Sequence, residues 1–265
     1  MQVKGKVLVV TGGGDGIGRQ IVLDLLRRGA TVAAADINLN GLNETQKLAS
    51  SLAAGLSVHQ VDIANRDSVA ALVAEVTRQH GHVDGVVNNA GIIHPFKPVN
   101  DLDYGVIERV VNVNLYGVIN VTKAFLPLLL ARPEAHIVNV SSMGGLFAFP
   151  LQTVYGATKA AVKVLSEGLF AELRGTHVGV TVVYPGAIAT DITKNSGVHN
   201  KSLEKSGFRG SSPQAAARQI VDGIEKNRFR VYVGMDSKVL DLVYRMNPRL
   251  VITNLSRLMN SVMSE

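Results

Sequence analysis

The chain has 265 residues, of which 46% are hydrophobic and 18% charged, and this composition excludes a disordered protein. Cysteine is absent, which excludes a disulfide framework and a thiolate metal site, and we expect no metal. The net charge of +6 comes mainly from residues 201–265, with eleven Lys or Arg against six Asp or Glu, but no basic run interleaved with aromatic residues predicts a nucleic-acid partner.

The first element is a buried strand that leads into a glycine-rich turn. Residues 1–6 show no small-residue cleavage site and no apolar run reaches membrane-spanning length, so a cytoplasmic protein is expected. Residues 7–10 are apolar, as in a parallel strand buried on both faces, and residues 11–18 supply the glycines before a helical pattern that ends at Gly29. Bare glycines at a helix N-terminus let a pyrophosphate approach backbone N–H groups, so this unit predicts dinucleotide binding; a plain turn is the alternative.

The next strand, residues 31–35, ends at Asp36. This acid lies roughly 20 residues beyond the glycines, where a carboxylate can bind the adenosine ribose hydroxyls. A 2′-phosphate would face both Asp36 and Asp15 with no basic residue directly after Asp36, so the sequence favours NAD. The alternative is an acid that only caps the following loop.

An alternation of strands and helices continues from there. A strand over residues 56–61 ends at Asp62, a helix runs from the Asn65 cap to Gly81, and a strand over residues 83–87 leads into residues 88–91. A long helical pattern over residues 106–128 carries Asn114 on its apolar stripe, where a hydrogen-bonded core amide is the ordinary interpretation.

The fifth strand, residues 137–140, delivers Ser141 and Ser142, and a helical run then carries Tyr155 and Lys159. Four residues apart on one face, the ammonium can act on the phenol and lower its pKa, which outlines an acid–base pair. A solvated helix face with the same spacing is the alternative. Ligands of open parallel sheets bind at the carboxyl ends of the strands, where Gly12, Asp36, Asn88 and Ser142 are expected to project.

The last third contains a sixth strand, a loop and two further elements. The strand over residues 178–183 opens into Pro185 and Gly186, and the polar residues 187–212 are expected to form a mobile substrate lid. Ser212 and a following proline start a helix, and residues 230–234 form a final strand. No linker or composition break divides the sequence, so we expect one domain over residues 1–265.

Residues 235–265 are expected to form a C-terminal helical extension. Asn247 and Pro248 have the form of a helix start, and apolar residues then follow at helical spacing from Val251 to Val262. Such a stripe needs a partner. Packing over the substrate mouth or against a second subunit is favoured; membrane contact is possible but not favoured, because only three arginines accompany the stripe.

Six motifs in order resemble the single-domain short-chain dehydrogenase/reductase family, over about residues 5–234: the glycine turn, residues 88–91, Asn114, Ser142, Tyr155 with Lys159, and Pro185 with Gly186. The resemblance implies an α/β fold, a Rossmann-type doubly wound parallel sheet of about seven strands in the order 3, 2, 1, 4, 5, 6, 7, with helices on both faces. It implies a homodimer or homotetramer and a catalytic set of Asn114, Ser142, Tyr155 and Lys159. The expected NAD contacts are Gly12, Asp15, Gly16, Ile17, Gly18, Asp36, Asp62, Ile63, Asn89, Ala90, Gly91, Tyr155, Lys159, Pro185, Gly186, Ile188 and Thr190.

The same resemblance implies hydride transfer between NAD and an alcohol or ketone, with Tyr155 exchanging the alcohol proton. Apolar residues after Ser142 predict a hydrophobic secondary alcohol or ketone as substrate. The expected pocket consists of Ser142, Met143, Gly144, Phe147, Phe149, Phe96 and Tyr155, with Ile92 and Ile93 beside it. Ordinary core packing is the alternative for Phe147 and Phe149. Two other functions stay open: a nucleotide-sugar epimerase or dehydratase, and an NAD-binding regulator without catalysis.

Overall fold

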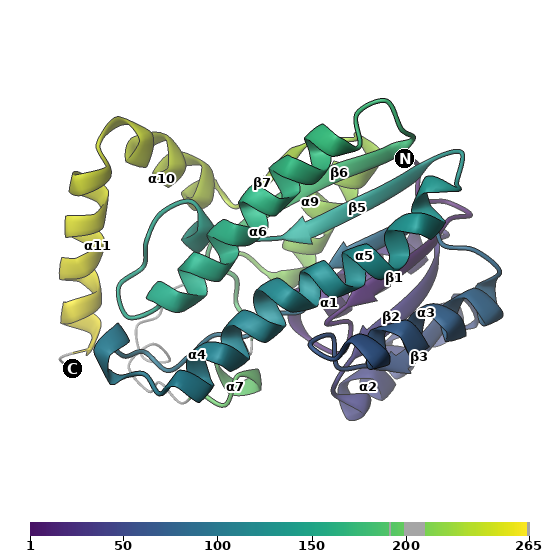
Figure 1. Ribbon diagram of the computed structural model, residues 1–265, viewed down its shortest axis with the longest axis horizontal. Helices are drawn as coiled ribbons and strands as arrows, with labels where there is room; N and C mark the ends of the chain where they lie inside the picture. Colours follow the sequence, from purple (N-terminus) through teal and green to yellow (C-terminus); the bar gives the residue numbers. More distant parts are fainter. Residues whose placement is uncertain (191, 199–209, 264–265) are drawn as a thin grey trace.

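Seven parallel strands form the central sheet of the computed structural model, which describes residues 1–190, 192–198 and 210–263. The sheet order is β3-β2-β1-β4-β5-β6-β7, with every neighbouring pair parallel, which confirms the predicted order (Figure 1). The strands are β1 Val7–Thr11, β2 Thr31–Asp36, β3 Leu56–Gln60, β4 Gly85–Asn88, β5 Ala135–Val140, β6 Val178–Pro185 and β7 Arg230–Val233.

Helices cover both faces of this sheet (Figure 1). One face carries α1 Gly16–Arg27, α2 Leu39–Ala49 and α9 Pro213–Glu225; the other carries α3 Arg66–His80, α5 Gly117–Leu130 and α6 Thr153–Glu172. Neighbouring strand residues alternate between the two cores, so Leu8 and Val10 pack in one while Val9 packs in the other. Because both faces are buried, the central strand β1 is an almost continuous apolar run.

Helix ends follow the predicted caps. Asn65 accepts a hydrogen bond from the Ser68 N–H at the start of α3, which ends at Gly81 in the left-handed region. Ser212 caps α9 in the same way, accepting from the Ala215 N–H. Each cap satisfies a backbone donor that the first helical turn leaves without a partner.

The α2 helix is the main element that the sequence pattern does not predict. It begins after Asn38, whose side chain accepts a hydrogen bond from the Gly41 N–H. Only Leu42, Thr45 and Ala49 are buried on it, so its apolar stripe is too sparse to stand out. The short helical turns η1 Ser50–Gly55, η2 Val99–Asp101 and η4 Met143–Gly145 complete the connections.

The long helical pattern after β4 consists of α4 Tyr104–Val111, the π-helical turn η3 Asn112–Tyr116, and α5. Within Tyr104–Leu130, an 18-residue window has a mean hydropathy of 1.4, so among the residues described this helix is long and apolar enough to span a membrane, and the expectation that no run reaches that length is wrong. In the fold, Val118, Val121 and Phe125 of this helix are buried against the sheet. Its apolar composition is therefore explained by the core that it covers.

The lid and the extension lie beyond the sheet. The described parts of residues 187–212 hold α7 Ile192–Asn195 and a bridge between Ile188 and Ser211, while residues 191 and 199–209, including Leu203 and Phe208, lie outside the described residues. The extension forms α10 Met235–Met246 and α11 Pro248–Met263, which confirms its helical character. Both helices stand at one end of the molecule (Figure 1).

Candidate active site

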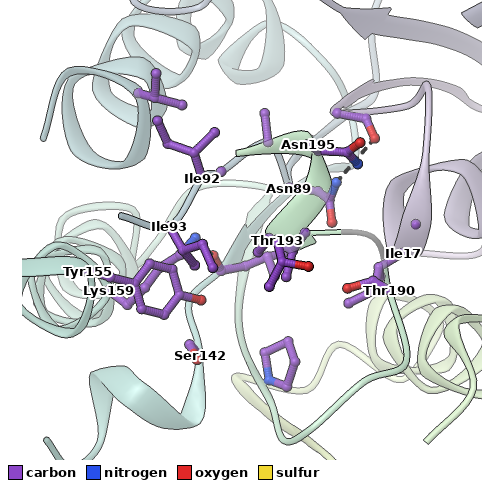
Figure 2. Close-up of a pocket in the computed structure, with 18 of the residues that line it drawn as sticks. Ile17, Asn89, Ile92, Ile93, Ser142, Tyr155, Lys159, Thr190, Thr193 and Asn195 are labelled. Atoms are coloured by element: carbon purple, nitrogen blue, oxygen red, sulfur yellow. Dashed lines mark hydrogen bonds between the residues drawn. The ribbon is translucent and has the colours of Figure 1, made fainter. Parts of the chain in front are cut away.

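A cavity of about 1100 Å³ lies at the carboxyl edge of the sheet and gathers most of the predicted site residues. Figure 2 shows Ser142, Tyr155 and Lys159 at one end of it and Asn89, Ile17 and Thr190 at the other. The predicted residues that line it are Gly12, Asp15, Gly16, Ile17, Asp36, Asp62, Ile63, Asn89, Ala90, Gly91, Phe96, Ser142, Met143, Gly144, Phe149, Tyr155, Lys159, Pro185, Gly186, Ile188 and Thr190. The segments that follow β1 to β6 therefore contribute to the cavity, as the rule for parallel sheets predicts.

The glycine turn leaves its backbone open to the cavity. Gly12 and Gly16 have φ of +68° and +52°, values that side-chain-bearing residues rarely adopt. Asp15 caps α1, because its carboxylate accepts a hydrogen bond from the Gly16 N–H at 2.7 Å. Gly18 lies under the turn, where a Cβ would collide with the Gly12 carbonyl oxygen. Its role is to let helix and turn pack closely, so it supports the cavity without lining it.

Asp36 is held in place by two backbone groups. Its Oδ2 accepts from the Gly14 N–H and its Oδ1 from the Asn38 N–H, both at 2.9 Å. The carboxylate also lines the cavity. Asp36 therefore caps the loop after β2 and also presents negative charge to the cavity. A loop cap and a ribose-binding acid are thus compatible roles for this residue.

Ser142 and Tyr155 face each other across one end of the cavity (Figure 2). Ser142 follows β5 and its Oγ accepts from the Gly144 N–H at 3.0 Å, which fixes the hydroxyl and leaves its proton free to donate. Tyr155 stands in the first turn of α6. Burial raises the pKa of its phenol, and the Ser142 hydroxyl opposes that shift by favouring the phenolate.

Lys159 follows Tyr155 by one helical turn and is almost fully buried. Its Nζ donates to the Val140 carbonyl at 3.0 Å and lies 5.9 Å from the centroid of the Tyr155 ring. Burial lowers the pKa of the ammonium to about 8. In this arrangement burial is the larger effect, so the pKa of the Tyr155 phenol lies above its usual value, and a lowering by Lys159 stays a prediction.

Asn114 lies in the π-helical turn, fully buried beside the cavity. Its Oδ1 accepts from the Ile92 N–H at 2.8 Å, and its Nδ2 donates to the Ile92 carbonyl at 2.9 Å and to Thr158 Oγ1 at 3.1 Å. Both amide protons are therefore engaged within the protein. The amide ties the loop after β4 to the helix of Tyr155, as the core interpretation predicts, and leaves an Oδ1 lone pair or a backbone carbonyl to position a water.

Two predicted positions need correction. Phe147 lies outside the cavity formed by the described residues, because its ring packs between Phe149 at 5.5 Å and Tyr244 at 5.8 Å. Its core interpretation is right, whereas Phe149 lines the cavity. Asn88 does not project at the edge either, since its Nδ2 donates to Thr122 and Asn139 within the core. Asn89 takes that place.

The segment after β6 adds residues that the sequence pattern does not single out. Asn195 Nδ2 donates to Asp15 Oδ2 at 2.8 Å, and Ser196 Oγ accepts from the Ile93 N–H at 2.9 Å. Thr193 also lines the cavity (Figure 2). These bonds tie the described part of the segment to both ends of the cavity, and the expected mobility of the segment stays a prediction. These residues could not be predicted from the sequence, because polar residues within a polar loop show no periodic pattern.

The chain matches known proteins along most of its length. The family model for short chain dehydrogenases matches residues 6–201. A Mycobacterium tuberculosis protein described as an oxidoreductase, SadH, is 39% identical over 251 residues, covering 91% of each chain. A short-chain dehydrogenase/reductase from Burkholderia phymatum, solved with NAD, has a TM-score of 0.85 at 25% identity, over 94% of this chain and 96% of its own. A short-chain dehydrogenase from Burkholderia cenocepacia, solved with NADP, has a TM-score of 0.79 at 25% identity, over 96% and 99%.

Proposed function

The chain belongs to the short-chain dehydrogenase/reductase family of nucleotide-binding oxidoreductases, and we propose that it transfers a hydride between NAD(H) and a hydrophobic secondary alcohol or ketone. One observation carries the proposal: Ser142, Tyr155 and Lys159 meet at one end of the same cavity that the glycine turn enters at the other. A dinucleotide spans such a cavity from pyrophosphate to reacting ring.

The residues at the turn fit a dinucleotide. Gly12, Gly14 and Gly16 line the cavity without side chains, so a phosphate can approach the N-terminus of α1, whose dipole attracts negative charge. Asp36 would bind the adenosine ribose, and Lys159 and Thr190 would hold the nicotinamide end. When bound, the nicotinamide supplies the hydride acceptor or donor.

The protein's own part of the reaction is to hold an oxygen and move a proton. The Ser142 hydroxyl would donate to the substrate oxygen, which places that oxygen within reach of the Tyr155 phenol. In reduction, Tyr155 gives its proton to the oxygen as it gains negative charge; in oxidation, the phenolate takes the alcohol proton. The buried ammonium of Lys159 would stabilise that phenolate, and Asn114 would support a water that returns the proton to solvent.

Membership of the family does not decide between NAD and NADP, because one solved relative contains NAD and another contains NADP. Our second proposal is that this protein prefers NAD. Asp36 carries a negative charge into the cavity, and Asp15 is a second acid at its wall. A 2′-phosphate next to these carboxylates would be repelled. We expect kcat/KM with NAD to exceed that with NADP by about tenfold or more, since a like-charge contact of about 1.4 kcal/mol is one decade.

The Asp36→Asn variant tests the cause of that preference. Asparagine keeps an oxygen for the Asn38 N–H and removes the charge, so the ratio of NAD to NADP efficiency should fall about tenfold. Asp101→Ala, an exposed acid outside the cavity among the described residues, is the control and should leave the ratio unchanged. Equal wild-type efficiency with both cofactors would overturn the assignment.

The substrate proposal rests on the apolar wall beside Tyr155. Ile92, Ile93, Phe96, Met143, Phe149 and Met259 line this part of the cavity. We expect purified protein with NAD to oxidise secondary alcohols with a bulky ring or chain faster than short polyols or charged hydroxy acids, as measured by NADH formation.

Phe149→Ala should lower kcat/KM about tenfold for bulky substrates and little for small ones, which serve as the control. A screen won by polyols or hydroxy acids would eliminate the idea.

We also propose that the protein is a cytoplasmic homodimer or homotetramer. The α6 helix leaves Val164 and Phe170 exposed, and α5 on the same face of the sheet leaves Leu130 exposed. Exposed apolar side chains on neighbouring helices fit a symmetric subunit contact. Sedimentation velocity would measure the assembly, and a monomer at micromolar concentration would contradict this proposal.

A further inference from the structure

The α10 helix has its apolar face turned to solvent. Met235, Val239, Leu242 and Met246 are 74%, 50%, 61% and 71% exposed, and their spacing of four, three and four residues places them on one stripe. The opposite face carries Ser237 and Asp241, which are 0% and 7% exposed. This is the reverse of the arrangement that a surface helix of a globular protein shows.

Specific contacts fix α10 in this orientation. Asp241 Oδ2 accepts from the Tyr232 hydroxyl at 2.8 Å and from Arg245 Nε at 3.1 Å, and Ser237 Oγ donates to the Gly234 carbonyl at 3.0 Å. Tyr244 stacks against Phe147 in the same interface. The Tyr232–Asp241 hydrogen bond and the Phe147–Tyr244 contact reach outside the helix, so α10 cannot turn its apolar stripe inward without breaking them, and the exposed stripe is a stable surface of the subunit.

Charges around the stripe have one sign. Within residues 235–259, apart from residue 258, the exposed charged side chains are Lys238, Arg245, Arg249 and Arg257. The two acids of this stretch are turned toward the protein: Asp241 as above, and Asp236 by accepting from the Ala187 N–H at 2.9 Å. The outer surface of α10 and of the start of α11 is therefore apolar and cationic together, since Leu250 in the first turn of α11 is 50% exposed as well.

We propose that α10 and the start of α11 bind the surface of an anionic lipid bilayer. The apolar stripe would enter the boundary between headgroups and acyl chains, while Lys238 and Arg249 contact the headgroups. An amphipathic helix with basic residues beside its apolar face is the structure that binds in this way. The sequence alone favours packing over the substrate mouth or against a second subunit. The orientation of α10 instead favours the membrane surface.

A second copy of the chain fits this surface less well. A two-fold contact would set the cationic surface of one subunit against the same surface of the other, with like charges opposed. A fluid anionic surface does not have this difficulty.

The position of α11 links this surface to the cavity. Met259 of α11 lines the cavity and is almost fully buried, and the same helix starts next to the C-terminal end of α10 (Figure 1). If the substrate is hydrophobic, as proposed above, it could pass from the bilayer along α11 to the site. Lipid binding itself does not depend on the reaction, so it can be tested without any substrate.

Flotation of the full chain with vesicles tests the proposal. We expect binding to phosphatidylcholine vesicles containing about 30% phosphatidylserine, and weak binding to phosphatidylcholine alone or in about 0.5 M salt, where surface charge is screened. Lys238→Gln and Arg249→Gln should each weaken binding about fivefold, because a cation near such a surface contributes about 1 kcal/mol. The double change Leu242→Glu with Met246→Glu should weaken it about tenfold or more.

Matched variants on the opposite end of the molecule are the controls. Leu48→Glu on α2 changes an equally apolar side chain that is 49% exposed, and Arg78→Gln on α3 removes an exposed cation; both should bind vesicles as the wild type does. Circular dichroism confirms that each variant folds. Absence of wild-type flotation with anionic vesicles overturns the proposal. So does a stripe variant that still floats, or one that instead changes the sedimentation coefficient without lipid, which would assign the stripe to a second copy.

Discussion

The Tyr155→Phe variant is expected to lose about a hundredfold or more in kcat while its Kd for NAD changes by less than about twofold. The substitution removes only the hydroxyl that would exchange a proton with the substrate. The phenyl ring stays, so the first turn of α6 and the position of Lys159 should be preserved. Turnover followed at 340 nm and NADH fluorescence titration separate the two quantities.

The raised pKa of Tyr155 also predicts how the reaction rate depends on pH. Burial raises the pKa of the phenol, so at neutral pH the hydroxyl carries its proton and can act as an acid in ketone reduction. Alcohol oxidation needs the phenolate, so its rate in the wild type should rise with pH. Tyr155→Phe should lack this rise as well as the activity.

The effect of Tyr155→Phe on turnover is compared with that of a tyrosine outside the site. Tyr104→Phe changes a tyrosine that is 83% exposed on α4 and should keep full turnover. If Tyr155→Phe retains nearly wild-type turnover, Tyr155 is not the proton donor. If the wild-type protein binds NAD and turns over no alcohol or ketone in the screen, the non-catalytic regulator is the better description.

Much of the fold follows from local rules that the sequence obeys. The strand β1 is an apolar run and β6 is rich in valine because both sheet faces are buried. Asn65, Gly81 and Ser212 mark helix ends by side-chain caps or a left-handed glycine. Rules of this kind act within a few residues. They identify elements well, and the fixed order of a parallel sheet then brings the loops after the strands to one edge.

What could not be predicted depends on contacts between distant residues. Phe147 and Phe149 are alike in sequence, yet Tyr244 from α10 covers the first and leaves the second on the cavity wall. Asn195 meets Asp15 across 180 positions of the chain. The exposed apolar face of α10 could not be predicted for the same reason. Its spacing of apolar residues predicts a buried face, and only the hydrogen bonds of Asp241 and Ser237 show that the opposite face packs on the protein.

The Lys159→Met variant is expected to damage both turnover and cofactor binding, which distinguishes it from Tyr155→Phe. Methionine fills a similar volume and removes the charge and its donors, so a folding defect is not expected. Loss of hydrogen bonds from a charged group costs about 1.5–3 kcal/mol, which predicts a rise of about tenfold or more in the Kd for NAD. A fall in kcat of about a hundredfold should accompany it, because the phenolate of Tyr155 loses its nearby cation.

The buried state of Lys159 predicts a pH dependence that isolates its charge. Burial lowers the pKa of the ammonium to about 8 in the protein without NAD, so the lysine is mostly cationic at pH 7 and loses its proton as the pH rises through about 8. The Kd for NAD in the wild type should therefore rise above pH 8, and the Lys159→Met variant should lack this rise. Lys163→Met, one turn further along α6 and paired with Glu167, is the matched control and should titrate as the wild type does. An NAD affinity that is equal in Lys159→Met and wild type from pH 7 to pH 9 would show that the ammonium does not hold the cofactor, and would leave it only the second role, stabilising the Tyr155 phenolate.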